Sequence, residues 1–119
     1  MSKYHSKKIT IDGETFDSRK EFRRWQELRL LEQAGVISQL ERQVPFELIP
    51  AIREPSITGP RGGIKQGRLI EKSVNYVADF VYYKDGQKVV EDSKGFHTAD
   101  YIIKRKLMLW VHRIRILET

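Results

Sequence analysis

Two β-rich runs joined by the dipeptide Asp85-Gly86 constrain the fold more than any other feature of this 119-residue sequence. The first run covers residues 69–83 and the second covers residues 88–94. Asp-Gly favours a two-residue type I′ turn, which joins neighbouring strands as an antiparallel hairpin. Once the turn is placed, the register of every cross-strand pair follows from it.

That register places Asp79 directly opposite Asp92, with Lys94 on the same face, because side chains alternate along a strand. Glu91 points to the other face, so Asp92 is the second carboxylate of the pair. Carboxylates in directly opposite positions lie about 5 Å apart. At an effective dielectric of about 20, their repulsion costs about 3 kcal/mol. The pair therefore needs a nearby cation.

Two kinds of cation could meet that need. Lys94 could bridge the two aspartates as an ordinary ion pair on the surface of the strands. Alternatively, a divalent metal could bind both carboxylates. Carboxylate oxygens are hard ligands and the chain has no cysteine, so a metal here would be Mg²⁺ or Mn²⁺ rather than Zn²⁺.

The N-terminal part of the chain predicts a hairpin followed by an amphipathic helix. Residues 8–17 hold a second Asp-Gly dipeptide between two short β-rich segments. Apolar residues at steps of three and four predict a helix over residues 18–34. Ser18 and Glu21 have the spacing of a capping box at its start. Glu21 also lies on the apolar stripe, so its carboxylate either bonds the backbone of the cap or joins the acidic residues of the sheet.

The remaining segments add a second helix and further strands. Together with the two hairpins they predict a mixed α/β fold with helices packed on a sheet, formed as a single domain over residues 1–119. Residues 50–68 are rich in glycine, proline and basic side chains, and predict a long loop that is either functional or disordered. The other predicted elements are strand segments over residues 36–40 and 44–49, a helix over residues 98–110 and a final strand over residues 112–117.

The composition is typical of a protein with a polyanionic partner. Lys and Arg number 22 against 16 Asp and Glu, which gives a formal net charge of +6 and a pI of about 9.7. No apolar run approaches the roughly 18 residues that span a bilayer, and residues 1–8 lack the apolar core of a signal peptide. We therefore expect a soluble cytoplasmic protein without membrane association. Basicity alone is weak evidence for the partner, since many unrelated proteins are mildly basic.

The order of elements and the paired acids resemble the PD-(D/E)XK nuclease superfamily. That superfamily has a restriction-endonuclease-like core of helix, three-strand antiparallel meander, helix and strand, here preceded by an N-terminal hairpin. Its signature is an acidic residue followed by an acid-x-Lys triplet across a hairpin, which corresponds to Asp79 and Asp92-Ser93-Lys94. Ala78 stands where the name-giving proline would be, and Asp92 replaces the more usual glutamate.

Two narrower resemblances accompany this one, the first over part of the chain and the second over nearly its full length. The segment from Ser18 to Ile37, followed by Glu41-x-Gln43, resembles the opening of TnsA-like transposon endonucleases. The whole chain is also similar to a small phage-encoded family of unassigned function, through residues 12–13, 16–18, 78–80 and 94–95. A phage protein of this kind would work in the cytoplasm of the host cell.

The superfamily resemblance implies a metal-dependent DNA endonuclease that hydrolyses phosphodiester bonds in phage DNA recombination, repair or replication, with branched DNA as one substrate class. It implies that Asp79, Asp92 and Glu21 hold one or two Mg²⁺ ions, with Mn²⁺ as a substitute. Lys94 would orient the attacking water or stabilise charge in the transition state. These four are the predicted catalytic residues.

Polar and basic side chains elsewhere are candidate DNA contacts. The TnsA-like match makes Gln43 a neighbour of the active site, although a strand residue of this kind can simply bond to backbone. The cations of the 50–68 loop and of the second helix could bind phosphates or could be solvated surface charge. The predicted substrate-binding residues are Gln43, Arg61, Lys65, Arg68, Lys104 and Lys106.

Two other classes of function are compatible with the same residues. One is a protein that keeps the nuclease fold and binds nucleic acid without cleaving it, and the other is a purely structural role for the acids. The presence of all three carboxylates together with Lys94 favours the enzyme, because a degenerate site would be expected to lose at least one of them. Cleavage of both strands would call for a homodimer, for which no segment of the sequence identifies an interface.

Overall fold

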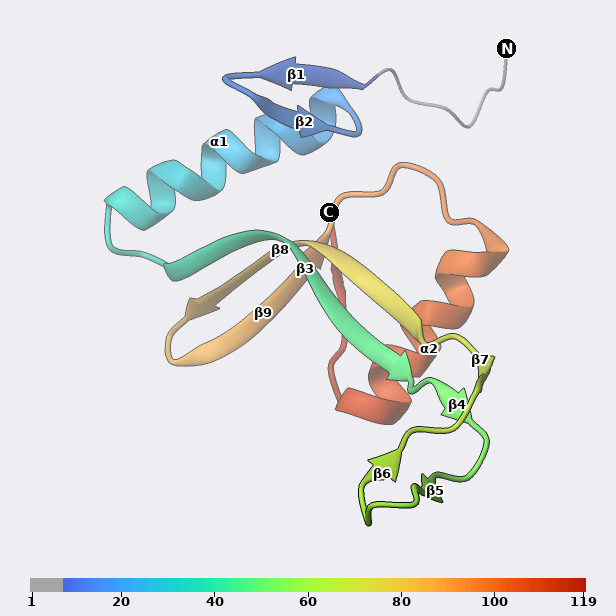
Figure 1. Cartoon of the computed structure of the whole chain (residues 1–119). Helices are drawn as coiled ribbons and strands as arrows, with labels where there is room; N and C mark the ends of the chain where they lie inside the picture. Colours follow the sequence, from blue (N-terminus) through green and yellow to red (C-terminus); the bar gives the residue numbers. More distant parts are fainter. Residues whose placement is uncertain (1–7) are drawn as a thin grey trace.

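The main sheet has four strands in the order β10-β9-β8-β3. It is seen in a computed structural model that describes residues 8–119 (Figure 1). The β3–β8 and β8–β9 pairs are antiparallel, and β10 pairs parallel with β9. The expectation about a signal peptide in residues 1–8 lies almost wholly outside the described residues. The strands are β3 (Ser38–Ile49), β8 (Val74–Lys84), β9 (Gln87–Asp92) and β10 (Leu117–Glu118).

The predicted turn and register of the β8–β9 hairpin are confirmed. Asp85 and Gly86 have φ values of 52° and 76°, as a type I′ turn requires of both central residues. The ladder runs from the pair Lys84–Gln87 to the pair Phe80–Glu91. Asp79 and Asp92 therefore lie just beyond its last pair.

The predicted N-terminal hairpin and first helix are also present. Strands β1 (Ile9–Ile11) and β2 (Glu14–Phe16) pair antiparallel, and α1 (Arg19–Gln33) follows them. Ser18 caps the helix, because its Oγ accepts a hydrogen bond from the Glu21 backbone N–H at 3.1 Å. Leu28 of α1 packs in a buried cluster with Phe80 and Tyr82 of β8. This packing brings the start of α1 close to the middle of β8.

The second helix, α2 (Ala99–His112), is longer than predicted, and the final strand is shorter. The helix includes His112 and ends at Arg113, whose left-handed φ of 59° closes it. The alternating residues after it predict a strand from 112 to 117, but the ladder to β9 holds only Leu117 and Glu118. Tyr101 and Met108 of α2 pack in the second buried cluster with Tyr76 of β8.

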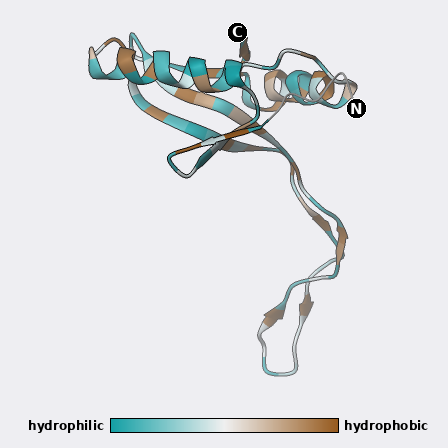
Figure 2. Cartoon of the chain, turned by 90° about the horizontal axis from the view of Figure 1, so that it is seen from above, coloured by the Kyte–Doolittle hydropathy of each residue, from teal (hydrophilic) through white to brown (hydrophobic). Residues whose placement is uncertain are grey.

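The expected loop over residues 50–68 is wrong in part, because the segment contains short paired strands. Residues 50–73 form an extension between β3 and β8 that stands away from the helices and the main sheet (Figure 2). The predicted strand over residues 69–83 is correspondingly interrupted at residues 72–73. The paired strands are β4 (Ile52–Arg53) with β7 (Leu69–Glu71), and β5 (Ile57–Thr58) with β6 (Ile64–Lys65).

The mixed α/β class is thus confirmed, with two helices and several sheets over the described residues. Figure 1 shows that α1, with the β1–β2 hairpin, and α2 lie at different ends of the sheet. Across residues 8–119, none of the helices has the length and apolar character needed to cross a bilayer. The end of β2 and the first turn of α1 lie close to the middle of β8, and the candidate site lies there.

Candidate metal centre

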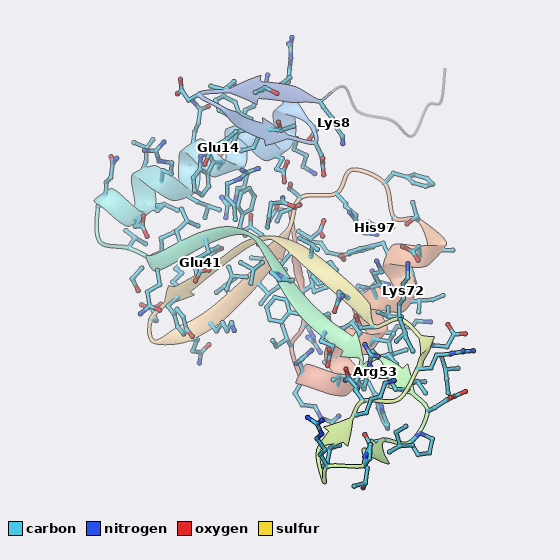
Figure 3. The ribbon with its side chains drawn as sticks, viewed as in Figure 1. Lys8, Glu14, Glu41, Arg53, Lys72 and His97 are labelled. Atoms are coloured by element: carbon cyan, nitrogen blue, oxygen red, sulfur yellow. The ribbon has the colours of Figure 1, made fainter. Side chains whose placement is uncertain are left out.

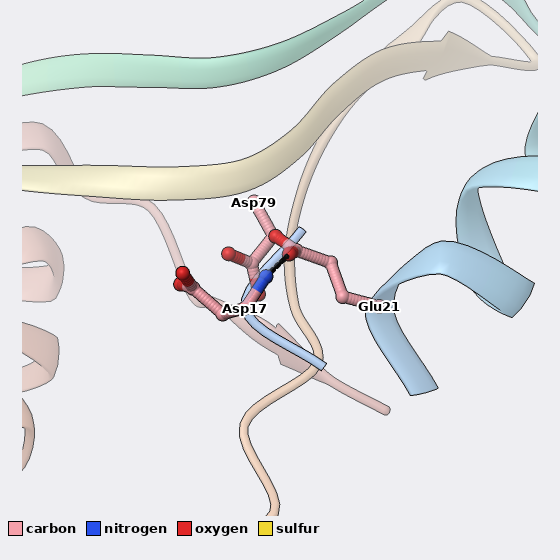
Figure 4. A group of neighbouring side chains, drawn as sticks. All are labelled: Asp17, Glu21 and Asp79. Carbon is pink, nitrogen blue, oxygen red and sulfur yellow. Dashed lines mark hydrogen bonds between the residues drawn. The ribbon is translucent and has the colours of Figure 1, made fainter. Parts of the chain in front are cut away.

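Three acidic side chains meet where the start of α1 approaches β8. Asp17, Glu21 and Asp79 each offer a carboxylate oxygen, and these oxygens lie within 4.8 Å of one another (Figure 4). Asp17 comes directly after β2, Glu21 from the first turn of α1, and Asp79 from the middle of β8. A group of carboxylate oxygens this close can bind a hard divalent cation.

Glu21 is held in this group by hydrogen bonds from two sides. Its side chain is buried, with 2% of the residue exposed. Oε2 accepts from the Asp17 backbone N–H at 2.7 Å, and Oε1 accepts from Gln43 Nε2 at 3.0 Å. The Glu21 carboxylate thus bonds the backbone N–H of Asp17, the residue before the cap, rather than that of the cap residue Ser18, and it also lies close to Asp79 of the sheet.

Asp79 is oriented by the residue that follows Asp92. Its Oδ2 accepts hydrogen bonds from the Ser93 backbone N–H at 2.8 Å and from Ser93 Oγ at 3.1 Å. Both residues are buried. These bonds connect β8 to the end of β9 just where the ladder stops.

Asp92 is buried beside Asp79 but is not one of the three clustered acids. Its Oδ2 accepts from the Tyr76 hydroxyl at 2.6 Å, and its Oδ1 accepts from the Lys94 backbone N–H at 2.9 Å. Glu91 points elsewhere, as expected, and bonds Arg24 and Tyr82. The predicted ligand set of Asp79, Asp92 and Glu21 is thus gathered only in part, and Asp17 takes the third place.

The concentration of acids raises two pKa values. Burial, with a further contribution from the Asp79 carboxylate, raises the pKa of Glu21 to about 7. Burial, followed by the charge of Asp79, also raises the pKa of Asp92 above its usual range. A raised pKa means that the charged form of these neighbouring carboxylates is disfavoured, and a cation bound between them would stabilise that charged form.

A pocket of about 960 Å³ opens beside these acids. Asp17 and Asp79 line it together with Lys94 and Lys104. The Lys94 Nζ lies 5.4 Å from the centroid of the Tyr101 ring, which is a cation–π distance. The pocket therefore brings carboxylate oxygens and lysine ammonium groups to one opening.

Of the predicted substrate-binding residues, Gln43 and Lys104 lie at this pocket and the others lie elsewhere. Lys104 Nζ is 3.6 Å from an Asp100 carboxylate oxygen. Lys106 is exposed on α2, outside the pocket lining. The other three are on the extension formed by residues 50–73, namely Arg61, Lys65 and Arg68.

Sequence reasoning missed three residues of this site. Asp17 has a detectable signal, since it stands directly before the N-cap Ser18 and so lies beside the first helical turn. Ser93 is the unspecified middle residue of the acid-x-Lys triplet, and nothing in that pattern predicts its bonds to Asp79. Lys8 lines the pocket only because the N-terminal hairpin folds over the start of α1.

The fold and site together define a mixed α/β protein with a carboxylate centre at the mouth of a partly basic pocket. Over residues 1–115 the chain matches the family described as "Protein of unknown function (DUF1064)", and it belongs to that family. Comparisons with curated proteins and with solved structures gave no match.

Proposed function

We propose that this protein is a Mg²⁺-dependent DNA endonuclease with a restriction-endonuclease-like core. The observation that carries the proposal is the convergence of carboxylate oxygens from Asp17, Glu21 and Asp79 within 4.8 Å, beside a pocket that Asp17 and Asp79 line together with Lys94. All the clustered donors are carboxylate oxygens, which fit Mg²⁺ or Mn²⁺ and do not favour softer metals.

The arrangement of the elements supports the same proposal. A helix, three antiparallel strands, a second helix and a short parallel strand follow one another in the described chain. The acidic residue and the acid-x-Lys triplet of the resembled signature come together at the open end of the β8–β9 hairpin, where Ser93 bonds Asp79. The signature and the topology are therefore two arguments for one class of protein.

The carboxylates would hold the cation at the pocket. Asp17, Glu21 and Asp79 are the residues that would bind it, and Asp92 lies beside Asp79 as a further acceptor. When bound, Mg²⁺ supplies a more acidic water and neutralises charge on the phosphate. Gln43 and Ser93 orient the Glu21 and Asp79 carboxylates through hydrogen bonds, so that their oxygens are fixed before substrate arrives.

Lys94 would act on the phosphate itself. Its backbone N–H is bonded to Asp92 and its ammonium group lies over Tyr101, so the side chain is tethered but exposed. An ammonium group at the mouth of the pocket can donate to a phosphate oxygen or to the attacking water, and stabilise negative charge that develops during hydrolysis. Lys104 and Lys8 add positive charge to the same opening.

A nuclease assay with several forms of DNA tests the proposal. Supercoiled plasmid, linear duplex, single-stranded DNA and a four-way junction are each incubated with Mg²⁺, Mn²⁺ or EDTA. We expect products with Mg²⁺ or Mn²⁺ and none with EDTA. Activity on the junction would further support a role in recombination or repair of phage DNA.

Two variants give this assay its controls. Asp79→Ala removes a clustered carboxylate and should abolish the products, whereas Asp12→Asn alters an exposed acid of the β1–β2 turn and should leave them unchanged. If the native chain shifts the DNA band without cutting the DNA, the protein binds nucleic acid but is not a nuclease. Products that persist in Asp79→Ala would contradict the proposed site.

A further inference from the structure

Residues 50–73 form an arm, made of two antiparallel segments that leave the main sheet between β3 and β8. The β4–β7 pair lies at its root and the β5–β6 pair near its tip. Figure 2 shows the arm standing clear of both helices, with apolar residues on its short strands. The chain around residues 59–63 reverses direction at the tip, where the Gly59 backbone N–H donates to the Gly63 carbonyl oxygen at 2.6 Å.

The two segments cross very closely at Gly67. A Cβ atom added there would lie only 1.9 Å from the Glu54 carbonyl oxygen. The Glu54 backbone N–H donates to the Arg68 carbonyl oxygen at 2.9 Å, and Arg53 Nη1 donates to the Gly67 carbonyl oxygen at 3.1 Å. Only glycine fits this crossing, so the shape of the arm depends on Gly67.

The arm carries much of the positive charge of the chain. It holds five basic residues and two acidic ones, a net charge of +3 out of the +6 of the whole sequence. Arg53 and Lys72 extend from its root (Figure 3). The other basic residues of the arm are Arg61, Lys65 and Arg68.

The arm also exposes apolar side chains that nothing in the described chain covers. Ile64 is 80% exposed and Ile57 is 60% exposed, one on each strand of the outer pair. Ile52 and Ile70 are about half exposed at the root, at 50% and 56%. A two-stranded ribbon is at best marginally stable on its own in water, so a binding partner that covers these side chains would stabilise the arm.

We propose that the arm binds in a groove of duplex DNA beside the candidate active site. The charge of the arm is complementary to the phosphate backbone, and a two-stranded ribbon fits the major groove, which is about 12 Å wide. Aliphatic side chains can contact thymine methyl groups or base steps there while the cations bind flanking phosphates. This assignment rests on the proposed function as a DNA endonuclease. It adds to that proposal which part of the DNA substrate the arm would contact.

The position of the arm limits where it can touch the substrate. From Ser73 at its root, the chain runs six residues along β8 to Asp79, which is about 20 Å at about 3.3 Å per residue. That distance equals about six base pairs at about 3.4 Å per step. The arm would therefore contact duplex DNA that begins about six base pairs from the scissile phosphate.

Binding measured in EDTA tests the arm without any need for cleavage. The native chain and Arg61→Ala/Lys65→Ala are compared on a duplex of about 30 base pairs over a series of salt concentrations. If both cations contact phosphates, the slope of log K against log salt should fall by about 2. The matched control Arg23→Ala/Lys84→Ala removes two exposed cations outside the arm and should leave the slope nearly unchanged.

A second variant tests the shape of the arm at constant charge. Gly67→Ala distorts the crossing with Glu54 and should weaken binding to the same duplex at least tenfold. Circular dichroism and sedimentation confirm that each variant remains folded.

The outcomes separate the arm from the proposed nuclease. If binding depends on the arm but the protein cleaves no DNA, the inference about the arm stands and the proposed nuclease function is wrong. Cleavage and binding that are the same in the native chain and both arm variants would overturn the arm assignment alone. A loss of self-association in the arm variants with unchanged DNA binding would also overturn it, because the arm would then contact a second copy of the chain.

Discussion

Arg24 of α1 and Glu91 of β9 form a bidentate ion pair, with Nε to Oε2 at 2.7 Å and Nη2 to Oε1 at 2.9 Å. Glu91 is fully buried, and the Tyr82 hydroxyl also donates to it at 2.8 Å. The pair joins the helix that carries Glu21 to the hairpin that carries Asp79. It thereby fixes the distance between the two parts of the acidic cluster.

Arg24→Ala should destabilise the protein strongly. Removing one partner of a buried ion pair leaves the other charge without compensation, at a cost of about 3 kcal/mol. Urea denaturation measures the change in the free energy of unfolding. The neighbouring exposed residue offers the matched variant Arg23→Ala, for which we expect a change of at most about 0.5 kcal/mol. Equal unfolding free energies for the two variants would show that the pair does not hold α1 in place.

The metal-free protein should lose stability as the pH rises from about 5 to about 8. The pKa of Glu21 is about 7 in the folded protein against an ordinary 4.5, so the folded chain holds this proton more tightly than the unfolded chain. The stabilisation is complete below pH 4.5 and is lost as the pH rises through 7. Denaturation in EDTA at several pH values measures this slope.

Glu21→Gln provides the control for that pH dependence. The variant cannot titrate at this position, so its stability should fall less between the same pH values. Mg²⁺ should restore stability to the native chain above pH 7, since carboxylates bind metal in their deprotonated form. A variant as pH-sensitive as the native chain would show that another group causes the slope.

Asp17→Asn should weaken metal binding without unfolding the protein. Asp17 is exposed and belongs to the acidic cluster, so its loss removes a ligand while the buried residues keep their contacts. We expect the Mg²⁺ concentration for half-maximal cleavage to rise by about tenfold or more, as substitution near metal sites commonly causes. Asp12→Asn, an exposed acid at the hairpin turn, is the comparison. An identical Mg²⁺ requirement in both variants would remove Asp17 from the ligand set.

Asp92→Asn should stabilise the metal-free protein while it abolishes cleavage. Burial and the Asp79 charge raise the pKa of Asp92, so a neutral side chain of the same shape relieves the repulsion. Tyr76 can still bond an amide at this position. The variant Glu91→Gln, at the adjacent position, should destabilise the protein but keep its cleavage activity. It weakens the ion pair with Arg24 and leaves the acidic cluster intact. Thermal denaturation and a cleavage assay on both variants distinguish the two roles.

The hairpin and the first helix were predictable because local chemistry determines them. The Asp85-Gly86 turn sets the register of β8 and β9, and that register separates Glu91 from Asp92. Ser18 caps α1 where the capping-box spacing predicts. In both cases a few neighbouring residues are sufficient to define the structure.

Other features depend on contacts that no local pattern encodes. Asp17 joins the cluster because the β1–β2 hairpin, α1 and β8 meet in space. The arm alternates glycine, proline and charged residues, which locally resembles a loop, and its pairing depends on the crossing at Gly67. The last strand is short because α2 continues to His112 and Arg113 then turns the chain.

Hydrolysis in water enriched in ¹⁸O tests the central claim most directly. Mass spectrometry of DNA products formed with Mg²⁺ reports whether solvent oxygen enters the new terminal phosphate. We expect one ¹⁸O atom per cleaved bond with the native chain, and no product with Asp79→Asn. The absence of cleavage by the native chain on every DNA form tested, or equal ¹⁸O incorporation by Asp79→Asn, would contradict the account.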